Sequence, residues 1–170
     1  MYDRILVLID GSAASEAGLS EGLRLARLSG GRMRVMHFVD DLPFIPAARA
    51  HGTPAYEPTA PAHARGAVFL ERARARAARA GVEVDTVMVE GVGARLADFV
   101  NQQVETWKAE IVVLGTQGRR GLGNVLLGGD AEDVIRHVRV PALLVHWETD
   151  PPSTDRALAT ERTVAVAAVD

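Results

Sequence analysis

Six glycines between positions 115 and 129 give this sequence its clearest potential for chemistry: Gly115, Gly118, Gly121, Gly123, Gly128 and Gly129. An apolar run at 111–114 precedes them, and an amphipathic segment at 130–138 and a second apolar run at 142–145 follow. Glycine lets backbone N–H groups approach an anion closely, and a helix N-terminus adds a favourable dipole. The stretch therefore predicts a strand, a phosphate-binding loop, a helix and a second strand.

Length and composition narrow the classes of protein to which the sequence can belong. The 170 residues suffice for one domain with a core, and 48% apolar and 24% charged residues are typical of a globular chain. A net charge of −3 argues against a dedicated nucleic-acid-binding protein. The absence of cysteine excludes disulfides and thiolate zinc sites. No stretch has the roughly 20 apolar residues of a membrane span, and the N-terminus lacks a signal-peptide pattern, so we expect a cytoplasmic protein without membrane contact.

Strand-like apolar runs alternate with helical patterns along the chain. We expect strands at 4–9, 32–39, 82–89, 111–114 and 142–145, separated by helices at 12–28, 62–80, 96–107 and 130–138. This alternation predicts a parallel doubly wound sheet with the first and fourth strands at its centre. Ligands bind such sheets beyond the carboxyl ends of the strands, where the strand order reverses. If the first and fourth strands are neighbours, that crevice is flanked by Asp10 and Gly115.

Two predicted helices contain arginines or a tryptophan that could suggest a binding site. Solvent exposure and core packing explain these residues without a ligand. The helix at 62–80 should bury a narrow stripe, while its arginines face water. The members of this stripe are Ala67, Leu70, Ala77 and Ala80. Trp107, at the end of the next helix, should belong to the core rather than to a ligand platform.

Two segments do not fit the alternation of strands and helices. Residues 40–61 contain five of the eight prolines and predict a long loop, which is either a lid or partner contact or an insertion without such a role. Residues 148–170 form a polar linker and an extension, in which 163–169 has strand-like composition. This extension is an extra edge strand, a contact with another chain or a frayed tail. We favour pairing with an edge of the sheet.

The glycine spacing resembles a known signature. Gly115, two residues, Gly118, nine residues and Gly128 match the nucleotide-binding pattern of the universal stress protein family. The opening ILVLIDGSAASE resembles the first strand and turn of that family, and MHFVD resembles its second strand. The similarity extends from Met1 to about His146, within a domain that we place at 1–147.

The resemblance implies a fold and an assembly. The fold is a Rossmann-like α/β fold of the adenine nucleotide alpha hydrolase type. Its sheet has five parallel strands in the order 3-2-1-4-5, with helices on both faces. Homodimers that pair through the fifth strand, here 142–145, are frequent in the family. The uncharged edge of this strand independently suits pairing between two chains. One branch of the family binds ATP.

Carried over position by position, the resemblance implies a set of nucleotide contacts. Asp10 would accept hydrogen bonds from the ribose, and the backbone around Phe38 and Val39 would meet the adenine edge. The other implied contacts with the ribose and phosphates are Leu8, Leu114, Gly115, Gly118, Arg119, Gly128, Gly129 and Asp130. Each has an alternative without a ligand: Asp10 can cap the helix that follows, and the glycines can form a tight turn.

Two departures weaken the triphosphate end of this site. Gly129 stands where the family has Ser or Thr, so a hydroxyl donor worth about 1 kcal/mol is missing. Asp130 follows, and a carboxylate near a phosphate would oppose binding by roughly a few kcal/mol. Asp130 could instead cap the helix after it. Arg119 and Arg120 could offset the repulsion or simply face water, and Mg²⁺ could bridge it.

The sequence and the resemblance thus predict a dimeric regulatory or protective module of the stress response that binds ATP or another adenine nucleotide, with or without Mg²⁺. The alternative is a scaffold of the same family that binds no nucleotide. Dedicated catalysis is not expected, because the chain has no Walker lysine loop and no residues placed to direct a nucleophile onto a phosphate. The five histidines show no metal-ligand spacing.

Overall fold

A computed structural model describes residues 1–40, 60–91, 94–117, 129–147 and 164–167. Their strands form one sheet in the order β3-β2-β1-β4-β5-β6. The strands are β1 (Arg4–Ile9), β2 (Arg32–Asp40), β3 (Val84–Gly91), β4 (Ile111–Gln117), β5 (Ala142–Trp147) and β6 (Val164–Ala167). The helices are α1 (Ala13–Ser29), α3 (Ala60–Ala80), α4 (Leu96–Thr106) and α5 (Gly129–His137). The proline-rich segment 41–59, for which we predict a lid, a partner contact or an insertion, lies outside the described residues.

The order of the parallel strands is the predicted one. β1 pairs with β2 on one side and with β4 on the other, and β3 and β5 extend the sheet in opposite directions, all in parallel. The strand order 3-2-1-4-5 is thereby confirmed, and it reverses between β1 and β4.

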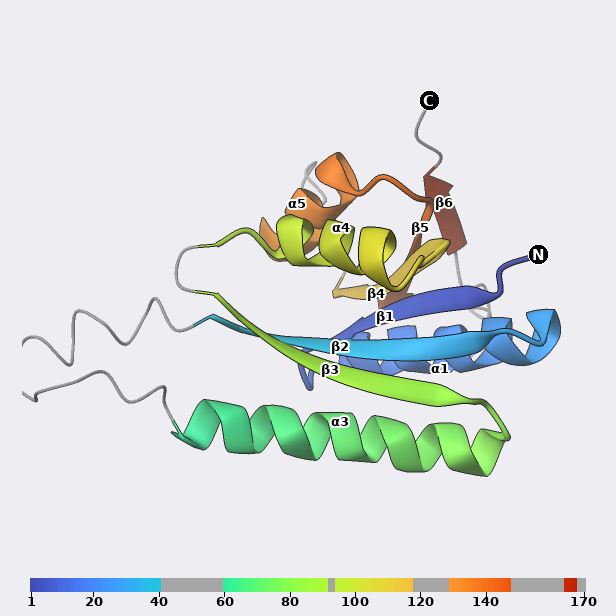
Figure 1. The fold of residues 1–170 in the computed structure, drawn as a ribbon, viewed down its shortest axis with the longest axis horizontal. Coiled ribbons are helices and arrows are strands. Elements are labelled where there is room, and N and C mark those ends of the chain that lie inside the picture. Colours follow the sequence, from blue (N-terminus) through green and yellow to red (C-terminus); the bar gives the residue numbers. More distant parts are fainter. Residues whose placement is uncertain (41–59, 92–93, 118–128, 148–163, 168–170) are drawn as a thin grey trace, which may run out of the picture.

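Side chains of the strands point alternately to the two faces of the sheet and form two apolar layers. From β1, Ile5, Val7 and Ile9 pack with α1 and α3, whereas Leu6 and Leu8 pack on the opposite face with α4 and α5. Figure 1 shows the two pairs of helices on opposite sides of the sheet. The predicted covering of both faces is confirmed, and it follows from the near-continuous apolar sequence of the central strands.

The first helix begins and ends where its sequence predicts. The Ser12 hydroxyl accepts a hydrogen bond from the Ser15 N–H at 3.1 Å, and Gly30 ends the helix in the left-handed conformation with φ 68°. Glycine carries no Cβ penalty there, so the helix stops without strain.

The predicted stripe on α3 is wrong at one position. Ala67 is exposed, whereas Leu70 and Ala77 are buried as predicted and Gly66 and Ala73 are buried as well. Gly66 lies against the His37 ring, where a Cβ would approach within 2.4 Å, so the helix turns its smallest residue toward the sheet. Most of the arginines do face water, as expected, and Trp107 is in the core with 9% of its surface exposed.

The strands run further than their apolar residues suggest. The hydrogen-bonded ladder between β4 and β5 continues through Thr116↔His146 and Gln117↔Trp147. A ladder is made by backbone groups, so polar residues extend it once the register is fixed by the buried ones.

The C-terminal strand β6 pairs antiparallel with β5. Of the outcomes predicted for the extension, pairing with a sheet edge is therefore the one observed, and the sheet has six strands. The outer edge of β5, at which we expect two copies to pair, is occupied by a strand of the same chain (Figure 1). Among the described residues, no helix has the length and apolar character needed to cross a membrane.

Candidate functional site

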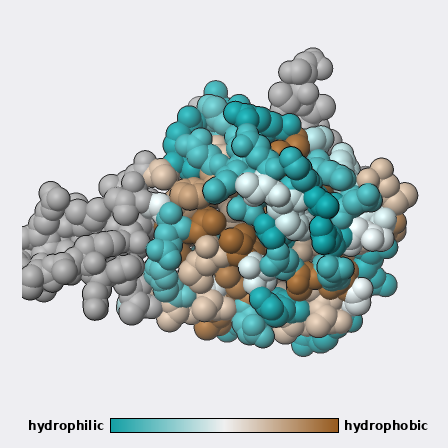
Figure 2. All heavy atoms as spheres, in the orientation of Figure 1, coloured by the Kyte–Doolittle hydropathy of each residue, from teal (hydrophilic) through white to brown (hydrophobic). Residues whose placement is uncertain are grey.

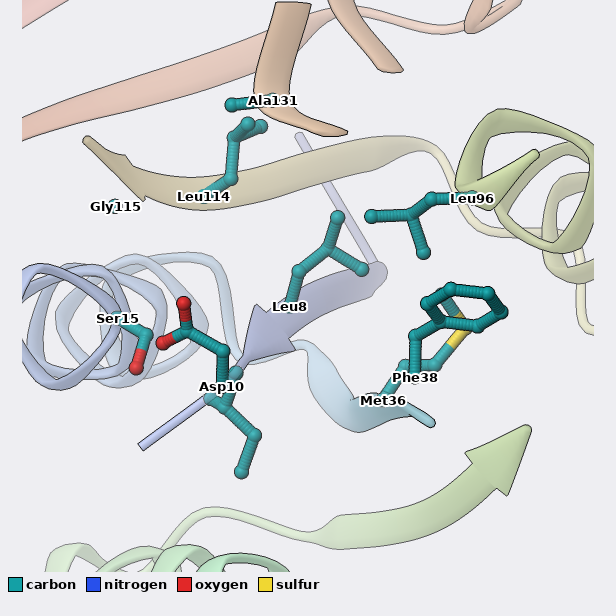
Figure 3. A pocket seen from close by; sticks show the side chains of 10 residues that line it. Leu8, Asp10, Ser15, Met36, Phe38, Leu96, Leu114, Gly115 and Ala131 are labelled. Atoms are coloured by element: carbon teal, nitrogen blue, oxygen red, sulfur yellow. The ribbon is translucent and has the colours of Figure 1, made fainter. Parts of the chain in front are cut away.

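A cavity of about 120 Å³ lies at the carboxyl ends of the central strands, where the strand order reverses. Its lining comes from strands on both sides of the reversal and from the starts of three helices (Figure 3). The lining residues are Leu8, Ile9, Asp10, Ser15, Met36, Phe38, Leu96, Leu114, Gly115 and Ala131. Small-molecule pockets usually measure roughly 300–1,000 Å³, so the described part of this site has room for a ring system but not for a whole nucleotide.

One side of the cavity is apolar. Leu8, Phe38, Leu96 and Leu114 converge on it in Figure 3. Phe38 also packs on Phe99 of α4, with ring centroids 5.4 Å apart, and this contact fixes its ring at the cavity wall. Flat aromatic and branched aliphatic side chains suit an apolar or aromatic ring, because they stack on it without hydrogen-bonding demands. Figure 2 shows apolar residues reaching the surface nearby, between α4 and the strands β2 and β3.

The other side carries one carboxylate. Oδ1 of Asp10 accepts a hydrogen bond from the Ser12 N–H at 2.9 Å, and Figure 3 shows the carboxylate turned toward Ser15. Partial burial tends to raise the pKa of Asp10, but hydrogen bonds from Ser12 and Ser15 outweigh it, and the pKa lies below its usual value of 3.8. Asp10 is therefore an ionised acceptor at neutral pH.

The two roles predicted for Asp10 are compatible. It does hold the turn before α1, as the alternative without a ligand requires. Ser12, however, is the residue that caps α1. An ionised carboxylate offers about four lone-pair sites, so acceptor capacity remains for ribose hydroxyls.

Gly115 allows α1 to pack closely against β4. A Cβ at Gly115 would lie 1.8 Å from the carbonyl oxygen of Ala14, and a Cβ at Gly18 would lie 2.8 Å from the Gly115 nitrogen. Helix α1 thus crosses β4 with backbone against backbone, which only glycine permits. The first glycine of the signature is explained by this contact whether or not a ligand binds.

The predicted site residues fall into four groups. Leu8, Asp10, Phe38, Leu114 and Gly115 meet at the cavity. The buried Val39 follows Phe38 on β2, where successive side chains point to opposite faces, and it is not part of the lining. The segment 118–128, with Gly118, Arg119 and Gly128, lies outside the described residues.

Gly129 and Asp130 form the start of α5. The helix begins one residue before Asp130, so this aspartate lies in the first turn and not at the capping position that we predict as one alternative.

Five lining residues are absent from the predicted set: Ile9, Ser15, Met36, Leu96 and Ala131. Met36 could have been found, because it lies two residues before Phe38 on the same face of one strand. Leu96 is the first residue of α4 and Ala131 lies in the first turn of α5, and only the packing of α4 against α5 brings them to the cavity.

Asp133 joins these two helices. It accepts hydrogen bonds from Nε of Arg95 at 3.1 Å and from the Ala97 N–H at 3.4 Å, and it lies 3.3 Å from Nδ1 of His137. The hydrogen bonds from Arg95 hold the pKa of Asp133 below 3.8. Asp133 is therefore a positioning residue that fixes the start of α4, and with it Leu96, against α5.

The chain matches proteins of one family along most of its length. The model of the universal stress protein family matches residues 1–146. A universal stress protein of Methanocaldococcus jannaschii is 30% identical over 147 residues, which are 85% of this chain and 82% of the relative.

Solved structures agree with this match. A universal stress family protein from Burkholderia pseudomallei is 28% identical with a TM-score of 0.65, over 85% of this chain and 96% of that one. A universal stress protein from Archaeoglobus fulgidus, solved in complex with dAMP, shares the fold at 20% identity and a TM-score of 0.59, over 84% and 97%. The chain belongs to the universal stress protein family.

Proposed function

We propose that the chain binds an adenine nucleotide in the cavity between β1 and β4 and serves as a regulatory or protective protein of the stress response. The observation that carries the proposal is the pairing of an apolar wall with the ionised Asp10 at the point where the strand order reverses. The Archaeoglobus relative that was solved with dAMP supports the choice of an adenine nucleotide.

The lining suggests how each part of the ligand would bind. The adenine ring would lie among Leu8, Phe38 and Leu114, and Asp10 would accept from the ribose hydroxyls. The phosphate would extend toward the start of α5, where helix N–H groups favour an anion. The backbone of the glycine-rich segment 118–128 would complete the contacts in the manner that its spacing predicts.

We expect short phosphate chains to bind better than long ones. Gly129 supplies no hydroxyl, and Asp130 adds a negative charge to the helix start that a terminal phosphate would approach. The described residues contain no cluster of three or more His, Cys, Asp or Glu that could hold a metal ion. Mg²⁺ would therefore bind together with the phosphates, as it commonly does.

Calorimetric titration with AMP, ADP and ATP, each with and without Mg²⁺, tests the proposal. Asp10→Asn should weaken AMP binding by about ten-fold or more, because a hydrogen bond to a charged acceptor is lost. Asp98→Asn is the matched control, since this exposed aspartate of α4 does not line the cavity. Absence of binding heat and of a thermal shift with all three nucleotides, from a folded protein, would contradict the proposal.

A scaffold that binds no nucleotide is the second candidate. The volume of about 120 Å³ and the presence of Asp130 in the first turn of α5 favour it. Under this alternative Asp10 serves only the turn before α1, so Asp10→Asn would change stability and nothing else.

The proposal includes three further properties. The protein acts by binding and not by catalysis, so incubation with ATP should release no ADP above the blank. It works in the cytoplasm, and two copies can pair through β5 to form a homodimer. Such pairing requires the outer edge of β5 to be free, and β6 occupies that edge in the described chain.

A further inference from the structure

The outer edge of β5 is paired along its apolar part. β6 runs antiparallel to it, from Ala142↔Ala167 to Val145↔Val164. On its inner side β5 pairs with β4 from Val112↔Ala142 onward. The backbone groups of 142–145 therefore have strand neighbours on both sides, and no second copy of the chain can pair with the same groups while β6 is in place.

Without β6, β5 would be an exposed edge with none of the usual protection. Its first four residues are uncharged and contain no proline: Ala142, Leu143, Leu144 and Val145. Unpaired edges of this kind are templates for another strand, and proteins normally blunt them with charges, proline or a covering segment. At the opposite edge of the sheet, β3 carries Asp85 and Glu90. The chain thus protects one edge with charge and the other with its own C-terminal strand.

β6 lies beyond the part of the chain that is shared with relatives. The family match ends at residue 146, one residue before the end of β5. The Burkholderia structure is matched over 96% of its length by 85% of this chain. The covering strand is therefore an addition to a body that is otherwise a complete family domain, and that body should fold without it.

We propose that β6 and the β5 strand of a second copy compete for one edge, so that the C-terminal strand controls whether the chain dimerises. A strand joined to its own sheet has an effective concentration on the order of millimolar, which exceeds the concentration of free copies. Only four residue pairs hold β6, however, so it can be displaced. The partner is a second copy presenting the same uncharged edge, which a two-fold axis allows. The inference extends the proposed dimer but does not depend on nucleotide binding.

Sedimentation analysis without nucleotide, over a concentration series, tests the competition. The full chain should be a monomer, and a chain ending at Trp147 should dimerise at least ten-fold more tightly. In the full chain, Ala165→Pro and Val166→Pro are made separately. Alternate residues of a strand direct their N–H groups to one neighbour, so one of the two must remove a hydrogen bond to β5. That variant should dimerise like the shortened chain. Ala157→Pro, the same change at a position outside β6, should leave the monomer unchanged.

Hydrogen exchange of the 142–145 amides locates the contact. They should be protected in the full-length monomer, exposed in the dilute shortened chain and protected again in its dimer. The inference is overturned if the full chain dimerises as tightly as the shortened one, or if every variant stays monomeric. It is equally overturned if shortening abolishes a dimer of the full chain, since β6 would then be exchanged between copies, or if the dimer leaves these amides unprotected. None of these outcomes affects the calorimetric test of nucleotide binding.

Discussion

Asp10 shows how one side chain can hold a turn and still be available to a ligand. Its Oδ1 receives the Ser12 N–H at 2.9 Å, which fixes the chain between β1 and α1. The same hydrogen bonds lower its pKa, so the carboxylate is charged at neutral pH. A charged acceptor that is already oriented pays little further ordering entropy when a hydroxyl binds.

Gly115 should behave as a packing residue. Gly115→Ala places a Cβ 1.8 Å from a backbone oxygen of α1, which cannot move without moving the helix. We expect a loss of about 1–3 kcal/mol in the free energy of unfolding, measured by urea denaturation. Gly30→Ala is the comparison, because Gly30 has φ 68° and open space around it, so only the backbone conformation opposes alanine. A loss at Gly115 no larger than that at Gly30 would show that the helix–strand contact is looser than described.

Asp130 and Gly129 should set the preferred phosphate length. Gly129→Ser with Asp130→Val restores a hydroxyl and removes a charge at the start of α5, so ATP affinity should rise about ten-fold, in line with one or two kcal/mol of electrostatic and hydrogen-bond gain. AMP, whose phosphate would end short of that position, should change little. Equal effects on ATP and AMP, measured by calorimetry, would place the carboxylate away from the terminal phosphates.

At the scale of elements, α4 and α5 form one wall of the cavity. Side-chain contacts hold these two helices to each other and to the sheet. Arg95, Asp133 and His137 connect the two helices at the surface, and Nδ2 of Asn101 donates to the His137 carbonyl at 2.9 Å. Beneath these contacts Val100 and Val134 are fully buried against the sheet. The apolar contacts supply the stability, and the polar ones fix the register of one helix on the other.

The effect of Asp133→Asn on the free energy of unfolding should depend on pH. The folded-state pKa of Asp133 is below 3.8, so its contribution to stability is fully present above that pH and is lost as the pH falls through the lower folded value. The difference in unfolding free energy between wild type and Asp133→Asn should therefore shrink in acid. Glu132→Gln, which removes a carboxylate paired with Arg136 on the same helix, is the control. A difference that grows in acid would contradict this assignment.

The elements show what the sequence can and cannot predict. Apolar runs and caps predict the five parallel strands and the ends of α1, and the family resemblance implies the strand order. They misplace Ala67, because the sequence does not reveal that Gly66 must face the His37 ring. Asp10 and Gly115 at the cavity follow from topology, and Leu8 and Leu114 follow from the family resemblance. Leu96 and Ala131 do not, because their positions depend on how two helices pack after the chain has left the sheet.

The whole molecule is a family domain with one added strand. Its central sheet gives the same location for a ligand as in any doubly wound fold, so the site depends on strand order more than on any single residue. We expect its assembly to depend on the added strand, which lies at the far edge of the sheet from β3. Ligand binding and self-association are thus assigned to different parts of one sheet.

The backbone contact between Gly18 and Gly115 determines which wall of the cavity can yield. Since α1 and β4 touch through main-chain atoms, the side bearing Asp10 and Gly115 behaves as a rigid block. The facing side is formed by α4 and α5, which are held by side chains, with Val100 and Val134 buried beneath exposed ion pairs. If a ligand larger than the described cavity binds, we expect the side chains of α4 and α5 to adjust before the backbone contact between α1 and β4 does.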